Sequence, residues 1–202
     1  RPLSLAAAPL VWLFLATTLW AQADPLSVYG RTKFEGEERI RQRQAKHLIF
    51  RTSWVYAARG NNFVKTILRL AKDKERLNVI ADQQGAPTSA ELIADVTALA
   101  LHRIGQMESP TAVAGTYHLA AQGETSWHGF ASAIVAAAAS LGVRQVPVVP
   151  ITTAEFPTPV RRPANSRLDC GKLERAFGVR LPPWQQGLAE CMALLGRHQN
   201  KA

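Results

Sequence analysis

Apolar residues recur along this chain in two alternating patterns. Stretches with apolar positions three and four residues apart predict helices, at residues 27–45, 62–73, 90–103, 126–141, 171–177 and 184–196. Short runs of mostly apolar residues predict strands, at residues 47–56, 77–80, 115–121 and 146–151. Because strands and helices take turns, the sequence favours an α/β fold with parallel strand pairing.

Polar residues with capping or turn preferences separate these stretches. Asn61 or Asn62 is expected to cap the second helix, and Ser89 and Ser126 the next two. Residues 82–89 contain a glycine and a proline, which predict a turn or loop.

Composition and charge narrow the possible partners. The chain has 202 residues, of which 47% are hydrophobic, enough for one domain or one and a half with a real core. The net charge is +9, but the basic residues are dispersed. Their densest cluster, residues 39–46, shares a predicted helix with Glu35, Glu37 and Glu38, as on a solvated charged face. We therefore expect no nucleic-acid partner; an anionic dinucleotide or nucleotide diphosphate suits a basic chain equally well.

Tyr29 and Lys33 form a Tyr-x-x-x-Lys pair near the start of the first predicted helix. Residues four apart share a helix face, so the phenol and the ammonium can point into one cleft. A cation about 4 Å away in an effective dielectric near 20 contributes roughly 4 kcal/mol. That lowers a tyrosine pKa of about 10 by up to about 3 units. Burial of the phenol opposes part of this shift, because it disfavours the charged phenolate. A tyrosine tuned in this way is a competent general acid for a carbonyl being reduced.

The Tyr-x-x-x-Lys spacing alone also occurs on ordinary surface helices, so the neighbouring sequence decides whether the pair is functional. The stretch from Pro25 to Glu38 resembles the active-site helix of extended short-chain dehydrogenases/reductases that act on nucleotide sugars. Later motifs are similar to those of the dTDP-4-dehydrorhamnose reductases: Arg51-Thr-Ser-Trp-Val-Tyr56, Gly60-Asn-Asn-Phe63, Asp82-Gln-Gln-Gly-Ala-Pro-Thr88, Ala90-Glu-Leu-Ile-Ala-Asp95, Asn165-Ser-Arg-Leu168 and Leu181-Pro-Pro-Trp184. The resemblance runs in order over residues 25–196.

The resemblance implies a partial Rossmann-like parallel sheet followed by a C-terminal substrate-binding lobe, over residues 25–202. The sequence has no Gly-x-Gly-x-x-Gly motif, so the half that holds a dinucleotide pyrophosphate at a helix N-terminus is expected to be absent. We therefore expect this polypeptide by itself to be inactive.

Residues 1–24 do not belong to the resemblance and are expected to be a non-homologous apolar segment. One positive charge, an apolar stretch and a terminal Ala21-Gln-Ala23 give them the outline of a secretory signal peptide. They also stand where the family has a strand with a catalytic Ser or Thr, and the chain begins at Arg1. A frameshift or fragment boundary is therefore the favoured interpretation, and the expected location is cytoplasmic. As an apolar piece, the segment is expected to stay disordered or to aggregate.

The resemblance also assigns roles at the catalytic end. Tyr29 would protonate the C4 oxygen while a hydride arrives from NADPH or NADH, and Lys33 would lower the pKa of Tyr29 and bind the nicotinamide ribose. Thr52 and Ser53 would meet the nicotinamide end, with a strand-end cap as the alternative.

Three further residues are implied in substrate binding. Trp54 would pack against the deoxyhexose, with a core aromatic as the alternative. Asn62 would offer its amide to the substrate, a role compatible with helix capping. Gln84 belongs to the loop expected to lie over the substrate.

Charged residues complete the implied site. Arg162 or Arg161, together with Arg167, would contact the diphosphate through bidentate hydrogen bonds, with surface arginines as the alternative. Glu91 falls where some family members place a carboxylate on magnesium at a dimer interface, but its usual partner position is occupied by Leu194. A lone carboxylate does not make a magnesium site, so no metal is expected.

The sequence thus predicts NAD(P)H-dependent reduction of the 4-keto group of dTDP-4-dehydro-L-rhamnose to dTDP-L-rhamnose. Two alternatives stay open. One is another nucleotide-sugar reductase or epimerase, against which Trp54 and the 82–88 loop speak. The other is a non-catalytic, nucleotide-sugar-binding regulatory subunit, against which the retention of Tyr29 and Lys33 speaks. The expected partner is a dTDP-sugar, with no membrane; the choice between NADH and NADPH and a homodimer stay open.

Overall fold

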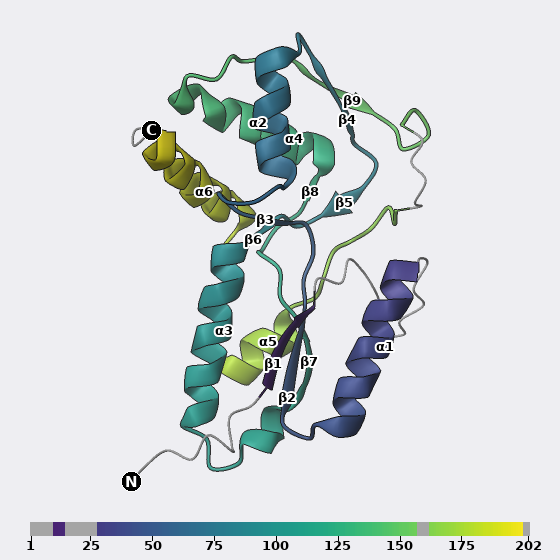
Figure 1. Ribbon diagram of the computed structural model, residues 1–202, viewed down its shortest axis with the longest axis vertical. Helices are drawn as coiled ribbons and strands as arrows, with labels where there is room; N and C mark the ends of the chain where they lie inside the picture. Colours follow the sequence, from purple (N-terminus) through teal and green to yellow (C-terminus); the bar gives the residue numbers. More distant parts are fainter. Residues whose placement is uncertain (1–9, 15–27, 157–161, 200–202) are drawn as a thin grey trace.

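The computed structural model describes residues 10–14, 28–156 and 162–199. Side chains are described within these ranges from Gly30 onward, except those of Pro110, His198 and Gln199. The elements form two groups, one above the other in Figure 1. Each group has its own apolar core.

A three-stranded parallel sheet forms the centre of the lower group. Its order is β1 (Leu10–Phe14), β2 (His47–Arg51) and β7 (Gly115–His118). The predicted α/β fold with parallel pairing is therefore confirmed.

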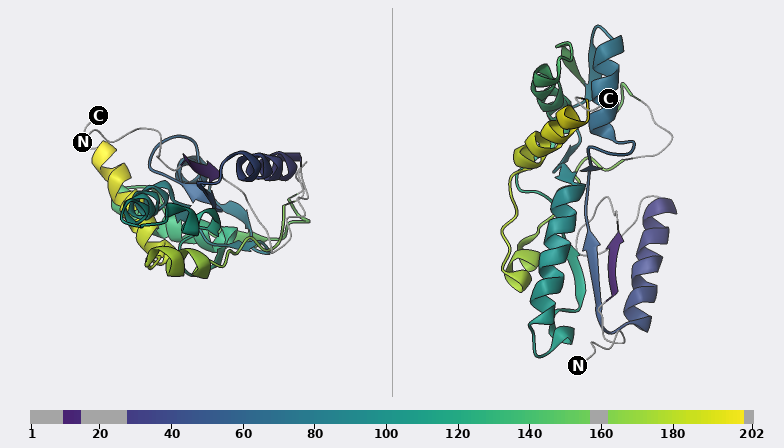
Figure 2. Two further views of the ribbon diagram at one scale, coloured as in Figure 1. Left: turned by 90° about the horizontal axis from the view of Figure 1, so that it is seen from below. Right: turned by 60° about the vertical axis from the view of Figure 1, so that its left-hand side comes forward.

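Helices cover both faces of this sheet (Figures 1 and 2). Helix α1 (Val28–Arg43) lies on one face, and α3 (Ala90–Gly105) and α5 (Gly171–Phe177) lie on the other. Successive residues of a strand point to opposite faces. Leu48 and Phe50 of β2 accordingly join the lower core with α3 and α5.

The upper group packs three helices around a second core. They are α2 (Phe63–Asp73), α4 (Trp127–Ala137) and α6 (Trp184–Gln199). A parallel pair, β4 (Leu77–Ile80) with β9 (Val148–Ile151), completes this group. The remaining elements are short: β3 (Val55–Tyr56) with β6 (Thr88–Ser89), β5 (Gln84–Gly85) with β8 (Thr125–Ser126), η2 (Pro110–Val113) and η3 (Ala138–Leu141).

Three predicted N-caps are confirmed. The side chains of Asn62, Ser89 and Ser126 each accept a hydrogen bond from a backbone N–H three residues later. These bonds satisfy N–H groups that have no partner within the helix. No helix among the described residues is long and apolar enough to cross a membrane.

Two predictions need correction. The strand predicted over 47–56 is broken, because Trp54 has a φ of 50°, in the left-handed region that interrupts an extended chain. Within the apolar segment 1–24, Leu10–Phe14 is a strand rather than a disordered stretch. It runs beside β2 in register from Leu10 opposite His47 to Phe14 opposite Arg51. The sequence Leu-Val-Trp-Leu-Phe supplies the branched and aromatic residues common in strands.

Candidate functional site

The Tyr29–Lys33 pair lies at the beginning of α1. The short connection after α1 turns the chain back into β2, so the start of the helix lies beside the carboxyl end of the strand (Figure 1). Lys33 is half-buried, and the phenol of Tyr29 lies outside the described side chains. The backbone places both residues on one side of the helix, as their spacing requires.

Thr52 and Ser53 follow directly after β2. Both are completely buried, and neither Thr52 Oγ1 nor Ser53 Oγ has a hydrogen-bond partner. An unsatisfied buried polar group costs about 1–3 kcal/mol. Two orphaned hydroxyls beside the start of α1 therefore fit the polar end of a ligand such as a nicotinamide cofactor, which is the role predicted for them.

Trp54 is packed inside the protein with only 7% of its surface exposed. Its indole stacks on Trp127, with ring centroids 3.6 Å apart and planes 12° apart. Gly85 lies so close that a Cβ there would be 2.6 Å from the indole Cε2. Trp54 is thus a core aromatic in this structure, and its contact with a sugar stays a prediction.

Asn62 uses its side chain within its own loop. Its Oδ1 accepts from the Lys65 N–H at 3.2 Å, while its Nδ2 donates to the carbonyls of Ala57 at 2.7 Å and Arg59 at 3.2 Å. The amide therefore shapes the turn before α2, and its substrate contact is untested.

The predicted substrate loop and the arginine segment lie side by side. The Gln84 N–H donates to Ala164 O, and the Ser166 N–H donates to Gln84 O, both at 2.7 Å. Arg167, one residue further on, donates to Glu124 at 2.6 Å in an exposed ion pair. The backbone thereby brings Gln84 near the Arg167 segment.

The other candidate charges are spread out. Arg162 is exposed, and Arg161 lies outside the described residues. Glu91 lies in the first turn of α3, and its Oε2 is buried without a hydrogen-bond partner. Among the described residues, no group of three or more His, Cys, Asp or Glu side chains could hold a metal ion.

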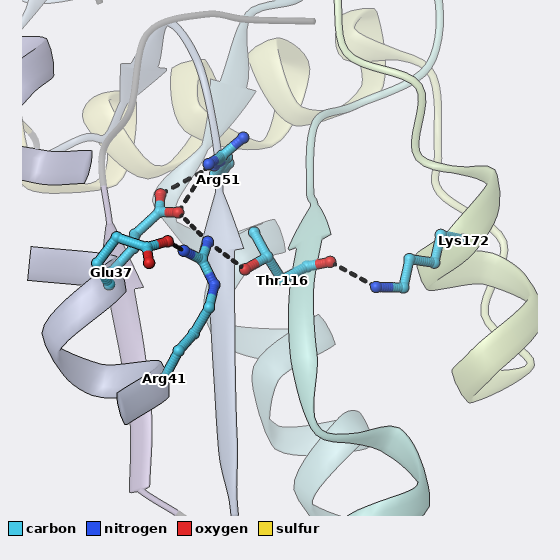
Figure 3. A network of polar contacts seen from close by, with 6 residues as sticks. Glu37, Arg41, Arg51, Thr116 and Lys172 are labelled. Atoms are coloured by element: carbon cyan, nitrogen blue, oxygen red, sulfur yellow. Dashed lines mark hydrogen bonds and ion pairs between the residues drawn. The ribbon is translucent and has the colours of Figure 1, made fainter. Parts of the chain in front are cut away.

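A buried charge network on the α1 face of the sheet was missed by the sequence analysis (Figure 3). Glu37 Oε1 and Oε2 accept from Arg51 Nε at 2.8 Å and Nη2 at 2.7 Å. Arg41 Nη2 donates to Glu37 Oε2 at 2.6 Å and to Thr116 Oγ1 at 3.1 Å. We call Glu37, Arg41, Arg51 and Thr116 the Glu37 network. Its only signal in the sequence is that Glu37 follows Lys33 by four residues.

Comparison with known proteins gives one consistent result. Residues 18–196 match the RmlD substrate binding domain. The chain belongs to this family. The match begins before residue 25, the boundary that the sequence suggested, and it contains every predicted site residue.

Named relatives of the family agree with this placement. The chain is 50% identical over 178 residues to a dTDP-4-dehydrorhamnose reductase of Shigella flexneri, covering 85% of this chain and 58% of that protein. A crystal structure of a Clostridium acetobutylicum dTDP-4-dehydrorhamnose reductase has a TM-score of 0.77 at 36% identity, over 94% of this chain and 61% of that one. A Bacillus anthracis dTDP-4-dehydrorhamnose reductase in complex with NADP has a TM-score of 0.74 at 34% identity, over 84% and 56%. The chain therefore spans somewhat more than half the length of these family members.

Proposed function

We propose that the protein to which this chain belongs reduces the 4-keto group of dTDP-4-dehydro-L-rhamnose to give dTDP-L-rhamnose. The observation that carries the proposal is the pairing of two features. The Tyr29–Lys33 helix starts beside a strand end where the Thr52 and Ser53 hydroxyls are buried and unpartnered. The named relatives support the choice of substrate and of NADPH as cofactor.

The chain's own residues would handle the proton. Bound NADPH would supply a hydride to C4 of the sugar. Tyr29 donates the phenolic proton to the C4 oxygen, which becomes the hydroxyl of the product, and the phenolate recovers a proton from solvent. Lys33 favours that phenolate electrostatically, because a cation four residues away on the same helix face lowers the phenol pKa. Thr52 and Ser53 offer hydrogen bonds to the cofactor end of the site.

Arg167 is suited to hold the substrate diphosphate. Its ion pair with Glu124 is 49% and 57% exposed on the two sides, and such surface pairs contribute only about 0–1 kcal/mol. A diphosphate, which offers bidentate contacts to a guanidinium, can therefore displace Glu124 at little cost. Strand β5, which contains Gln84, would place the predicted substrate loop, residues 82–88, against the same nucleotide.

Substrate binding by the 202-residue chain tests the proposal without cofactor. Calorimetric titration should give tighter binding of dTDP-L-rhamnose than of UDP-glucose. Arg167→Gln should weaken binding about 10- to 100-fold, since hydrogen bonds to charged groups contribute about 1.5–3 kcal/mol. Arg69→Gln, an exposed arginine on α2, should change nothing. Equal affinity for both nucleotides would favour another nucleotide-sugar enzyme, and no binding of either would contradict the proposal.

Catalysis is tested in a chimera. Residues 28–199 would be joined behind the part of the Shigella flexneri reductase that the match does not cover, and NADPH oxidation by the keto-sugar would be followed. Tyr29→Phe should lower the rate about 10²- to 10⁴-fold, the usual contribution of a general acid. Tyr56→Phe is the matched control, because the buried Tyr56 hydroxyl has no hydrogen-bond partner. Activity of the 202-residue chain alone would contradict only the expectation that it is inactive.

A further inference from the structure

Glu37 is the only buried residue among the described side chains of α1, residues 30–43. Its side chain is 2% exposed, and that of Arg51 is 14% exposed. No apolar residue of this stretch is buried to the same degree. The most deeply buried of these side chains is therefore a carboxylate, held by a guanidinium of the sheet through two parallel hydrogen bonds (Figure 3).

Tyr29, Lys33 and Glu37 follow one another at intervals of four residues. Each interval turns the helix by about 40° beyond a full turn, so the three positions fall within an arc of about 80°. An attachment at Glu37 thus decides which way the Tyr29 and Lys33 positions face.

The attachment also sets the height of the helix along the strand. Because α1 and β2 run in opposite directions, moving from Glu37 to Lys33 is moving from Arg51 towards Ser53. Four helical residues rise about 6 Å, and two strand residues about 7 Å. Pairing Glu37 with Arg51 therefore brings Lys33 level with Ser53, the end of the strand that carries the orphaned hydroxyls.

We propose that Glu37 and Arg51 are positioning residues that fix the rotation and height of α1, and so set the Tyr29–Lys33 pair against Thr52 and Ser53. The proposal rests on the proposed function for the role of that pair. A bidentate Arg–carboxylate contact suits the task, because its planar fork specifies direction as well as distance. Arg41, also on α1, donates both to this carboxylate and to Thr116 on β7, so the network connects the helix to two strands rather than one.

Glu37→Gln removes the charge while keeping the shape, and Glu38→Gln is its matched control. Glu38 also bonds to Arg41 and is the next residue along the helix, but its side chain is 43% exposed. Hydrogen exchange in the 202-residue chain should show α1 amides opening about 10- to 100-fold faster in Glu37→Gln. Amides of α3 and α6 should keep their protection, and Glu38→Gln should match the unaltered chain.

Tyrosine titration gives a readout that loss of stability alone would not move. The chain has three tyrosines, and burial raises the pKa of both Tyr56 and Tyr117. The first phenolate to form on raising the pH is therefore assigned to Tyr29. If the Glu37 network positions α1, Glu37→Gln shifts this first step to higher pH. Simple loss of a negative charge would shift it to lower pH, so the direction separates the two effects.

Arg51→Lys keeps the positive charge but cannot make the bidentate contact. It is the second variant, used if Glu37→Gln does not fold. Arg51→Lys should move the first phenolate step to higher pH, as Glu37→Gln does. The double variant Arg51→Lys with Glu38→Gln should show the same shift as Arg51→Lys alone. Equal loss of protection in α1 and α3, or an unchanged first step with faster α1 exchange, would overturn the proposal. Neither measurement uses substrate or cofactor. A failure of dTDP-sugar binding would therefore refute the proposed function and leave this result standing.

Discussion

Helices α1 and α3 lie on opposite faces of one sheet and are attached to it by different chemistry. Helix α3 buries four apolar side chains in the lower core, Ile93, Val96, Ala100 and Ile104. Helix α1 buries a carboxylate, Glu37, bonded to Arg51 of β2 and to its own Arg41. The face of the sheet towards α3 is thus apolar, whereas the face towards α1 carries a paired charge beside the buried Ile49.

The difference teaches what each contact is suited to do. Apolar burial is favourable in proportion to area and has no preferred direction, so α3 supplies stability. A bidentate ion pair gains little net free energy over an apolar contact, but it has a strict geometry. Geometry matters most beside reacting groups, and α1 is the helix that carries Tyr29 and Lys33, the pair proposed to be catalytic.

The largest effect is expected from breaking the buried pair. Glu37→Ala leaves the Arg51 guanidinium, 14% exposed, without its carboxylate, and removing one member of a buried pair costs about 3–5 kcal/mol. Urea unfolding should show this loss in the free energy of unfolding. Glu38→Ala, which removes a surface carboxylate one residue away, should cost less than about 1 kcal/mol. Similar losses in both variants would mean that the burial of Glu37 is unimportant.

The apolar side of the comparison is tested at Ile93, which is 2% exposed. Ile93→Ala removes buried methyl groups and leaves a cavity, at a cost of about 2–5 kcal/mol. Leu99→Ala on the same helix, where Leu99 is 39% exposed, should stay within about 0.5 kcal/mol. Unlike Glu37→Ala, this change should leave the Tyr29 titration step in place. A shifted step would remove the distinction drawn between the two helices.

The apolar attachment of α3 could be predicted from the sequence, whereas the charged attachment of α1 could not. The apolar positions of α3 at 93, 96, 100 and 104 repeat at helical spacing, so both the helix and its buried face could be predicted. The range of α1 was also predicted to within two residues at each end. Its attachment was not, because a glutamate amid charged neighbours indicates a solvated face. The pairing partner Arg51 lies in a strand, beyond what local periodicity can relate.

The candidate site shows the same limit. The helix caps and the position of Thr52 and Ser53 at a strand end follow from local sequence. Trp54 has a left-handed backbone conformation, and its indole stacks on Trp127 and packs against Gly85. This arrangement depends on contacts between segments more than 25 residues apart. Such contacts are fixed by tertiary packing, which overrides local preference. For this reason the sequence favoured a sugar contact for Trp54 and kept the core role only as its alternative.

A smaller effect is expected at the beginning of α3, where Ser89 Oγ accepts from the Leu92 N–H at 3.2 Å. Ser89→Ala removes this cap and should cost about 1 kcal/mol in the free energy of unfolding. Ser109→Ala is the control, because Ser109 precedes η2 without a side-chain capping bond. It should be close to neutral. Since α3 keeps its apolar face, thermal melting of Ser89→Ala should stay a single transition; a separate early loss of α3 would show that the cap rather than the core holds the helix.

The smallest effect concerns His118, which ends β7 near the Glu37 network. Burial, and then the positive charge of Arg51, lower the pKa of His118 below its ordinary value. The folded chain therefore resists protonation at a pH where the unfolded chain, with a histidine pKa of about 6.5, takes up a proton. Stability from this residue is present above about pH 6.5 and is lost as the pH falls towards the folded pKa.

Melting temperatures between about pH 5 and 8 measure this loss, and His118→Gln should flatten the curve across the unfolded histidine pKa of about 6.5. His102→Gln, at an exposed position on α3, should keep the slope of the unaltered chain. Hydrogen exchange sharpens the comparison further. A proton on His118 adds a positive charge beside Arg51, so α1 amides should lose protection on acidification before α3 amides do. Equal loss on both faces would mean that the charge network does not make the α1 face the pH-sensitive side of the sheet.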